Sequence, residues 1–293
     1  MGKKSILGLI LSLLIVIGIV TIGCAEKAET KALRMAVVPA GEALAEVERY
    51  EPIAVYLSEQ IGREIEMVIA TDYTAVIIAL KTGDCDIARF GPFSYLLAVE
   101  EAKAEIIVRG VKKSTGQDAY HGYIITRADS GIKTLDDLRG KTFAFVDVAS
   151  TSGYLIPQAV LKGAGIDPEK DFAETFFAGS HPAVIEVVKN GQVDAGAIAD
   201  NRWEDAMEAG IIEEGELFIV YKTDPIPMSP EVVRSGMDPE LKKKIQDAYL
   251  NMPSELSKQA VGKISGYVIA VDSDYDFLRE VAKVLDLDLN KME

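Results

Sequence analysis

The sequence predicts an α/β fold of two lobes, each a mostly parallel sheet flanked by helices. Short apolar runs alternate along the chain with longer runs in which apolar residues recur at helical spacing. That alternation is typical of parallel strands joined by crossover helices. The chain has 293 residues, 48% of them hydrophobic and 26% charged. This is enough for two ordinary domains and argues against a disordered chain.

The elements of the first half follow in the order βαβαβ. An apolar run at 33–38, ended by Pro39, predicts the first strand, and helical spacing at 43–61, stopped by Gly62, predicts the first helix. The other expected elements are strands at 65–70, 86–90 and 106–111 and helices at 73–81 and 94–102. This order is the signature of a mostly parallel sheet.

The second half repeats the pattern after a loosely patterned segment at 112–118. A strand is expected at 120–126, and Thr134-Leu135-Asp136-Asp137 resembles a capping box, which predicts the start of a helix. Further strands are expected near Thr142, Thr175, Asp194 and Leu217, with helices near Tyr154, His181 and Asn201 and at 239–250 and 275–285. We therefore expect one lobe to comprise 33–119 with 222–293, and the other to comprise 120–221.

The N-terminal segment, 1–24, has the pattern of an export signal. Lys3 and Lys4 precede an uncharged, apolar stretch at 6–22, and Gly23-Cys24 follows it. The ending resembles the lipobox of bacterial lipoproteins, which implies a lipid on Cys24, although Thr21 stands where that box usually has Leu. The length of the stretch also leaves an uncleaved membrane anchor open. Either outcome, through a polar tether at 25–32, places the folded part at the outer face of a membrane.

Composition excludes several classes of site and partner. The chain has only two cysteines, and if Cys24 carries lipid, Cys85 has no partner, so a disulfide scaffold and a cysteine-based metal site are excluded. The formal net charge is −15 with two histidines, which argues against binding to nucleic acid by counterion release. We expect no metal and no cofactor. An acidic protein that binds an anion has to do so with local donors.

One motif supplies such donors. Ser150-Thr151-Ser152-Gly153 lies between an apolar run at 142–146 and a run of helical spacing that begins near Tyr154. The first N–H groups of a helix lack intrahelical partners and carry partial positive charge, so a helix start can hold an anion. The three hydroxyls add donors that rotate to suit a ligand. The alternative is an ordinary helix cap, because Ser and Thr are preferred there without any ligand.

Three further side chains are candidates, each a weak signal alone. Tyr73 opens an expected helix, and Tyr120 lies where the chain passes from one lobe to the other. His181, followed by Pro182, lies at the start of another helix, where an imidazole can donate to a phosphoryl oxygen. His121 points to the opposite face of its strand from Tyr120, so we do not expect it to bind the ligand.

Enzyme motifs are lacking in the sequence. No Gly-rich Walker loop is present, and Ser152 lacks the Gly-x-Ser-x-Gly frame of a nucleophile elbow. A triad of Ser150, His181 and an aspartate stays open as an alternative, but no residue pattern places an acid to orient the imidazole.

Five segments, in order and spacing, resemble one family. They are Thr-Asp-Tyr at 71–73, Asp-Ile-Ala-Arg-Phe-Gly-Pro-Phe-Ser-Tyr at 86–95, Ile-Lys-Thr-Leu-Asp-Asp-Leu-Arg-Gly-Lys at 132–141, Ser-Thr-Ser-Gly at 150–153 and Gly-Gln-Val-Asp-Ala at 191–195. The chain resembles the PhnD-like substrate-binding proteins of phosphate, phosphite and phosphonate ABC importers. The resemblance implies a type II-like periplasmic-binding-protein fold, whose lobes are joined by two crossover strands and close on a ligand in the cleft between them.

The resemblance also implies a set of ligand-binding residues. They are Tyr73, Tyr120, Ser150, Thr151, Ser152 and His181, with Tyr95 as a further cleft candidate. Members that take aminoalkyl phosphonates have an Ile-Pro-x-Asp-Pro stretch whose carboxylate resembles a counter-ion for the ligand amine. This chain has Ser229 at the position of that Asp. We therefore expect an uncharged substituent, such as methyl or hydroxyalkyl, or else phosphate or phosphite itself.

The function expected from the resemblance is that of an extracytoplasmic solute-binding component of an ABC importer, not an enzyme. The ligand would be a phosphorus oxyanion held by neutral donors and a helix start, the partner a membrane permease, and the protein a monomer. Two alternatives from other classes are a ligand-sensing module for a membrane receptor and an enzyme built on the same fold. A different ligand, such as a pyrimidine precursor of thiamine, would require aromatic side chains on both faces of its ring. Phe90, Phe93 and Trp203 could contribute to such a site.

Overall fold

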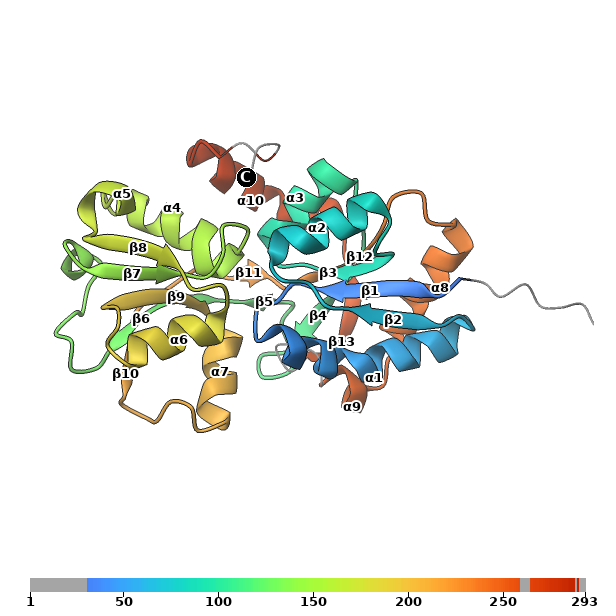
Figure 1. Ribbon diagram of the computed structural model, residues 1–293, viewed down its shortest axis with the longest axis horizontal. Coiled ribbons are helices and arrows are strands. Elements are labelled where there is room, and N and C mark those ends of the chain that lie inside the picture. Colours follow the sequence, from blue (N-terminus) through green and yellow to red (C-terminus); the bar gives the residue numbers. More distant parts are fainter. Residues whose placement is uncertain (1–30, 259–263, 288, 290–293) are drawn as a thin grey trace, which may run out of the picture. The chain divides into compact units, whose positions relative to one another are not determined.

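The computed structural model describes residues 31–258, 264–287 and 289. Within them the chain forms two sheets of different size, which build the two lobes that the sequence predicts, and a short ladder of two further strands (Figure 1). The expected signal peptide and Cys24 lie outside the described residues. Among the described residues, no helix combines the length and the apolar character needed to cross a membrane.

The first lobe is built on a six-stranded sheet in the order β13-β4-β12-β3-β1-β2. Its strands are β1 (Leu33–Val37), β2 (Ile65–Val68), β3 (Ile87–Arg89), β4 (Glu105–Lys112), β12 (Pro230–Val233) and β13 (Ile264–Ile269). The helices between these strands are α1 (Ala43–Ile61), α2 (Tyr73–Thr82), α3 (Pro92–Ala102), α8 (Pro239–Leu250) and α9 (Ser254–Ser257). The chain ends in η3 (Asp272–Tyr275) and α10 (Asp276–Val284).

The second lobe is built on a five-stranded sheet in the order β10-β6-β9-β7-β8. Its strands are β6 (Gly122–Arg127), β7 (Thr142–Phe145), β8 (Glu174–Phe177), β9 (Ala195–Ala199) and β10 (Leu217–Lys222). Its helical elements are η1 (Asp136–Leu138), η2 (Thr151–Leu155), α4 (Ile156–Gly163), α5 (Pro168–Asp171), α6 (His181–Lys189) and α7 (Asp200–Glu208).

The chain passes between the two sheets twice, and the two passages pair with each other. β5 (Ala119–Tyr120) follows β4, and β11 (Ile226–Pro227) follows β10. The two are antiparallel, with Tyr120 opposite Ile226 and Ala119 opposite Pro227. This short ladder is the pair of crossover strands that the family resemblance implies.

In detail both sheets are mixed, where the sequence predicts mostly parallel ones. β1 is parallel to β2 and β3, and β7 is parallel to β8 and β9, as expected for strands joined by helices. β12 and β13, however, enter the first sheet after the chain has returned from the second lobe, and they pair antiparallel. The antiparallel pairing follows from long-range topology, which local periodicity does not encode.

The helix expected to start at Thr134 is a single 3₁₀ turn, η1. The capping interaction itself is present, since Oδ2 of Asp137 accepts from the backbone N–H and the hydroxyl of Thr134. The turn cannot continue as a helix because Gly140 takes a left-handed conformation, φ 70°, and β7 begins two residues later.

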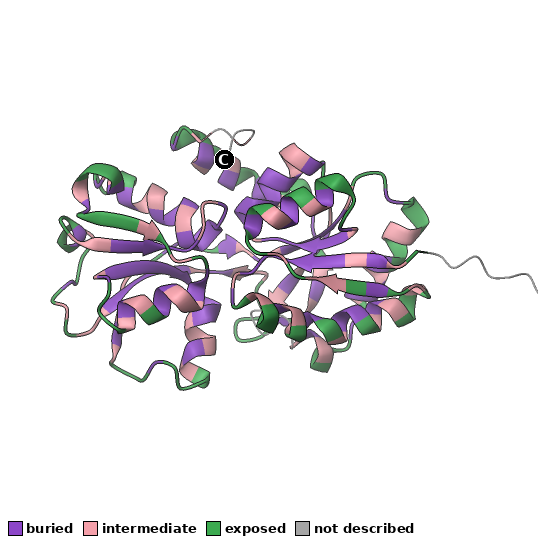
Figure 2. Cartoon of the chain, viewed as in Figure 1, coloured by how far each residue is buried: buried purple, intermediate pink, exposed green. Residues whose placement is uncertain are grey.

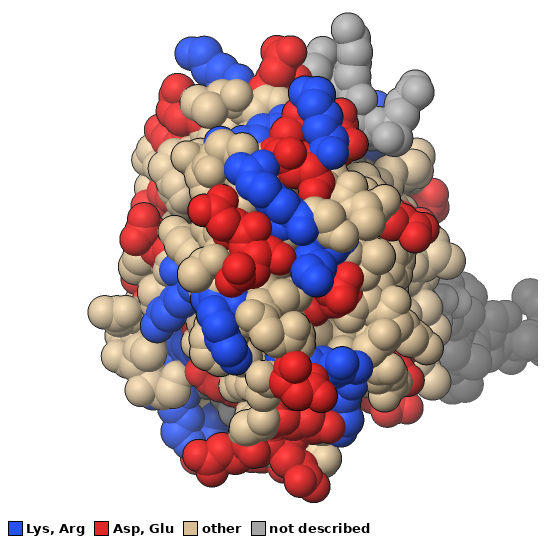
Figure 3. Space-filling view, turned by 90° about the vertical axis from the view of Figure 1, so that its left-hand side faces the viewer, with Lys and Arg blue, Asp and Glu red and all other residues tan. Residues whose placement is uncertain are grey.

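Buried side chains follow most strands of both sheets, whereas β8 at the edge of the second sheet is mostly exposed, and most helices bury one face and expose the other (Figure 2). The face shown in Figure 3 carries basic and acidic side chains side by side, without a patch of one sign. This face of the acidic molecule, whose net charge is −15, therefore shows no basic patch.

A close contact at Gly196 predicts that the second sheet has no room for a larger residue there. A Cβ on this β9 glycine would lie 2.5 Å from Cγ1 of Val184 and 3.1 Å from the carbonyl oxygen of Ala144. We expect Gly196→Ala to lower the free energy of unfolding by roughly 1–3 kcal/mol, measured by urea denaturation. Gly266→Ala in β13 is the control, because a Cβ there meets nothing within 4 Å. Equal denaturation midpoints for the two variants would contradict this account.

Candidate ligand-binding site

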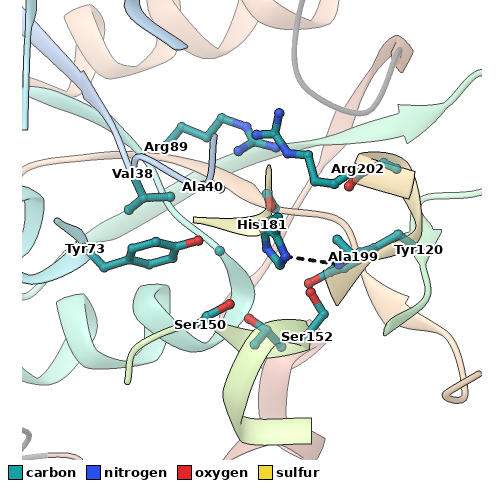
Figure 4. A pocket seen from close by; sticks show the side chains of 14 residues that line it. Val38, Ala40, Tyr73, Arg89, Tyr120, Ser150, Ser152, His181, Ala199 and Arg202 are labelled. Atoms are coloured by element: carbon teal, nitrogen blue, oxygen red, sulfur yellow. Dashed lines mark hydrogen bonds between the residues drawn. The ribbon is translucent and has the colours of Figure 1, made fainter. Parts of the chain in front are cut away.

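A small cavity lies where strands of both sheets end. Fourteen described residues line it (Figure 4). The volume open to the centre of a water-sized sphere is about 30 Å³. The lining residues are Val38, Ala40, Tyr73, Arg89, Gly91, Tyr120, Ser150, Thr151, Ser152, His181, Ala199, Asn201, Arg202 and Ser229. Most of them follow the carboxyl ends of β1, β3, β7, β8 and β9, which is where open α/β sheets bind ligands. Of the eight expected binding residues, seven line this cavity.

The Ser-Thr-Ser motif forms one wall of the cavity. Ser150 caps the helical segment, its hydroxyl accepting from the N–H of Gly153 at 3.1 Å, so the ordinary capping role is present. The segment opens with the π-helical turn η2, a feature found frequently at functional sites. The Thr151 hydroxyl accepts from the N–H of Phe93 in the other lobe at 2.8 Å. Its own proton is therefore free to be donated elsewhere, and the motif touches both lobes.

Gly153 allows this turn to pack tightly. A Cβ at this position would lie 2.4 Å from Cγ2 of Val146 and 2.8 Å from the Ser150 hydroxyl. Only glycine therefore lets the turn lie against the end of the β7 segment while Ser150 keeps its cap.

His181 presents one defined ring nitrogen to the cavity. Its Nδ1 accepts from the N–H of Ala199 at 3.2 Å, the dashed bond in Figure 4. Nε2 therefore carries the proton and acts as a donor. Burial, with a smaller effect from the positive charge of Arg202, lowers the pKa of His181 to about 3. The imidazole is neutral at physiological pH, and its backbone N–H bonds Ala40 of the other lobe at 3.1 Å.

The same bond argues against the serine triad. In a triad, the ring nitrogen remote from the serine donates to a carboxylate that orients the imidazole. Here Nδ1 of His181 accepts from the N–H of Ala199. It therefore carries no proton and cannot donate to a carboxylate that would orient the ring.

The two tyrosines are buried, neutral donors. Tyr73 begins α2, directly after Asp72, whose carboxylate accepts from the N–H of Ala75 at 2.7 Å and caps the helix. Its hydroxyl points into the cavity in Figure 4. Burial raises the pKa of Tyr73, and it raises that of Tyr120 to about 12, against hydrogen bonds from Ser152 and Thr151. Both keep their protons and can donate them to an anion.

Two arginines line the cavity, which the sequence analysis missed. Arg89 ends β3 and lies directly opposite Glu231 of β12, with Nε 3.6 Å from Oε1. Arg202 on α7 donates from Nη2 to Oε1 of Glu46 on α1 at 2.6 Å. The expectation of neutral donors and a helix start is thus incomplete. For Arg89 the missed signal was an arginine inside an apolar strand run, since a buried guanidinium needs a buried counter-ion. Arg202 stands in a polar helical segment, which gave no such signal.

The carboxyl partner of Arg89 has a shifted pKa. Burial raises the pKa of Glu231 to about 7, with the charge of Arg89 and a hydrogen bond from Tyr249 opposing the rise. Each guanidinium at the cavity thus has a buried carboxyl partner, Glu231 for Arg89 and Glu46 for Arg202. Neither carboxyl group lines the cavity.

The remaining wall is apolar or polar without charge. Val38, Ala40 and Ala199 contribute apolar surface, and Asn201 and Ser229 contribute the polar groups. Oδ1 of Asn201 is buried without a hydrogen-bond partner. No Asp or Glu occurs among the described residues that line the cavity.

Tyr95 does not line the cavity, so the expectation for this residue is wrong. Its hydroxyl donates to Oδ1 of Asp272 at 2.7 Å, and its ring meets Tyr275 edge-on, with centroids 5.1 Å apart. The reason is its place on α3, whose face here packs against η3 and α10.

The aromatic residues named for a pyrimidine ligand also lie elsewhere. Phe90 and Phe93 are fully buried in the core, and Trp203 packs edge-on against Tyr123, with centroids 6.2 Å apart. None of these three lines the cavity. In the described part of the chain, no group of three or more His, Cys, Asp or Glu could hold a metal ion.

Comparison with known proteins decides the family. A family model described as "ABC transporter, phosphonate, periplasmic substrate-binding protein" matches residues 35–275. The chain belongs to this family. Periplasmic phosphonate-binding proteins of this kind are transporter components that bind a substrate and are not enzymes, and the family implies export from the cytoplasm.

Individual members of the phosphonate-binding family are similar over most of the chain. The phosphate-import protein PhnD of Mycolicibacterium smegmatis is 31% identical over 86% of this chain and 85% of its own length. The phosphonates-binding periplasmic protein of Escherichia coli is 30% identical over 73% of this chain and 64% of its own. The crystal structure of a binding protein component of an ABC phosphonate transporter from Pseudomonas aeruginosa has a TM-score of 0.80 at 26% identity, covering 87% of this chain and 86% of its own.

The lowered pKa of His181 predicts a pH dependence of stability. The unfolded chain binds a proton at His181 below its ordinary pKa of 6.5, whereas the folded protein does not until about pH 3. The free energy of unfolding should therefore fall as the pH is lowered from 7.5 to 5.5, with about 1 kcal/mol of the loss due to this residue. Urea denaturation of wild type and His181→Gln in phosphate-free buffer measures it. A stability difference between the two proteins that is the same at both pH values would contradict the prediction.

Proposed function

We propose that this phosphonate-binding-family protein takes a small phosphorus oxyanion with an uncharged substituent and presents it to a membrane permease. The observation that carries the proposal is the cavity itself, where donors converge from both lobes and no carboxylate is among the described lining residues. Phosphate, phosphite, methylphosphonate and a hydroxyalkyl phosphonate have this chemistry. An ammonium group on the ligand would find no anion to pair with.

The binding residues that we propose are those of the cavity wall. Ser150, Thr151, Ser152, His181, Tyr73 and Tyr120 would donate to the phosphoryl oxygens, with Arg89 and Arg202 adding charge, and Asn201 and Ser229 would face the substituent. A buried polar group left without a partner costs about 1–3 kcal/mol, so this donor set selects against a ligand without matching acceptors.

The size of the cavity supports a small ligand. About 10–15 Å³ of the same measure is enough to hold one water molecule, and this cavity offers about 30 Å³. That suits a tetrahedral oxyanion with a hydrogen, hydroxyl or methyl substituent better than a bulky phosphonate.

Ligand binding would close the cleft, because the donors belong to different lobes. Tyr73 comes from α2 of the first lobe, while Ser150 and His181 come from the second. An anion can meet all three only when the lobes are together, so occupancy shifts the equilibrium between open and closed forms. The closed form would be the state that the permease recognises.

The cellular setting is also part of the proposal. Residues 1–24 would direct export, lipid on Cys24 would hold the protein at the outer face of the cytoplasmic membrane, and the protein would act as a monomer beside an ABC permease. We place the lobes at 33–119 with 222–293 and at 120–221. The support is the signal pattern of the sequence and the strands that each sheet contains.

Isothermal titration of the full-length chain against four ligands tests the ligand class. We expect micromolar or tighter binding of methylphosphonate, phosphite or phosphate, and at least tenfold weaker binding of 2-aminoethylphosphonate. The reason is that its ammonium group would lie near Ser229 without a counter-ion. Tight binding of 2-aminoethylphosphonate would overturn the proposed substituent, and no binding of any of the four would overturn the proposed ligand class.

Restoring a carboxylate should change the preference. Ser229→Asp places a negative charge in the cavity wall, so we expect methylphosphonate to bind at least tenfold more weakly, about 1.4 kcal/mol. The ratio of affinities should shift toward 2-aminoethylphosphonate. Ser235→Asp, at an exposed position outside the cavity, is the control and should leave both affinities within a factor of two. An unchanged ratio in Ser229→Asp would show that Ser229 does not face the substituent.

A further inference from the structure

An ion pair joins the two lobes at the wall of the ligand cavity. Arg202 belongs to α7 of the second lobe and Glu46 to α1 of the first. Nη2 of Arg202 lies 2.6 Å from Oε1 of Glu46, and the two side chains are only 4% and 3% exposed. Arg202 lines the cavity, whereas Glu46 does not. The guanidinium therefore faces the ligand space on one side and the opposite lobe on the other.

A second ion pair crosses between the same two helices farther from the ligand. Arg49, one turn along α1, lies 3.4 Å from Oδ2 of Asp205, and that oxygen is also 3.6 Å from Nη1 of Arg202. The side chain of Arg49 is 33% exposed and does not line the ligand cavity. The chain thus offers a buried and a half-buried pair of the same kind, on the same helices.

We propose that Arg202 is a ligand-binding residue that couples the bound anion to the first lobe, with Glu46 as its positioning residue. This inference rests on the proposed function for the identity of the ligand. Glu46 holds the guanidinium so that its remaining N–H groups face the cavity. The bond can exist only when α1 and α7 are together, so the orientation of Arg202 toward the anion and closure of the cleft depend on the same contact.

Electrostatics explains why such a contact makes closure depend on an anion. Closing the cleft removes Arg202 and Glu46 from water, and for a buried pair this cost is close to the attraction gained. The pair alone therefore drives closure weakly. An anion in the cavity gives the guanidinium a second negative partner in a place without water, where the interaction is strong. Replacing Glu46 leaves the arginine with only the more distant Asp205, 3.6 Å from Nη1, as a counter-ion in the closed form. In the open form water solvates the guanidinium.

The test measures affinity and closure in the full-length chain. The variants are Glu46→Gln, Arg202→Gln, Arg202→Lys, the double variant Glu46→Gln/Arg202→Gln, and Arg49→Gln as the matched control. Titration with methylphosphonate gives the affinities, and small-angle X-ray scattering with and without ligand gives the degree of closure. Urea denaturation checks that each variant is folded, and Arg202→Lys keeps the charge if Arg202→Gln does not fold.

We expect Glu46→Gln to weaken binding at least tenfold and Arg202→Gln at least a hundredfold. The double variant should be within threefold of Arg202→Gln, because Glu46 acts through Arg202. Arg202→Lys should bind better than Arg202→Gln, and Arg49→Gln should stay within threefold of wild type. At saturating methylphosphonate, Glu46→Gln should be more open than wild type in scattering, whereas without ligand the two should differ little because the pair alone drives closure only weakly.

Three results would overturn the inference. They are a loss under threefold in Glu46→Gln, additive losses in the double variant, or a loss in Arg49→Gln as large as in Glu46→Gln. If wild type binds no phosphorus oxyanion, the proposed function fails. The inference fails separately if wild type binds methylphosphonate and Glu46→Gln closes on it as fully as wild type does.

Discussion

An anion buried between two lobes has to find its hydrogen-bond donors on both of them. In this protein that requirement is met by the topology, because strands β1, β3, β7, β8 and β9 all end at the cavity. Several contacts between the lobes use residues of the cavity wall, although others, such as Arg49–Asp205 and Lys112–Asp200, lie outside it. Thr151 accepts from the N–H of Phe93, and the N–H of His181 donates to Ala40. The groups that we propose to hold an anion therefore overlap with the groups that hold the lobes together.

Charge at the cavity is balanced locally and not by the protein as a whole. The molecule carries −15, so its long-range field repels an anion, and the ligand has to be stabilised by close contacts. Arg89 and Arg202 each have a buried carboxyl group beside them. The Arg202–Glu46 pair therefore contributes little net charge, whereas the charge of Arg89 is only partly cancelled near neutral pH, because burial raises the pKa of Glu231 to about 7. Hydrogen-bond geometry then has to supply much of the selectivity. Neutral donors with fixed protons, such as Nε2 of His181, suit that task.

The sequence predicted many of the residues that line the cavity, because the signals for them are local. Ser150 and Asp72 cap helices through bonds that span three residues, so the sequence around each residue is enough to indicate the cap. Arg89 and Arg202 were missed because Glu231 and Glu46 are far away along the chain, and only the β3–β12 register and the meeting of α1 with α7 bring them together.

Other errors in the prediction have the same kind of cause. Tyr95 was expected at the cleft from the family resemblance, but the direction of its side chain depends on packing against Tyr275. The antiparallel strands β12, between β3 and β4, and β13, at the edge beside β4, depend on where the returning chain enters the sheet. The local pattern of apolar residues encodes neither the direction of the Tyr95 side chain nor the position of these two strands.

Tyr120 has a place that differs from that of every other cavity residue, since its strand β5 pairs with β11 alone. A rotation of one lobe against the other would bend the chain at these two crossings, and atoms close to a rotation axis travel least. Ser229 follows β11 by two residues. The part of the cleft near Tyr120 and Ser229 would therefore change shape least when one lobe rotates against the other. An incoming anion could dock on this part of the cleft first, and encounter and closure would be separate steps in time.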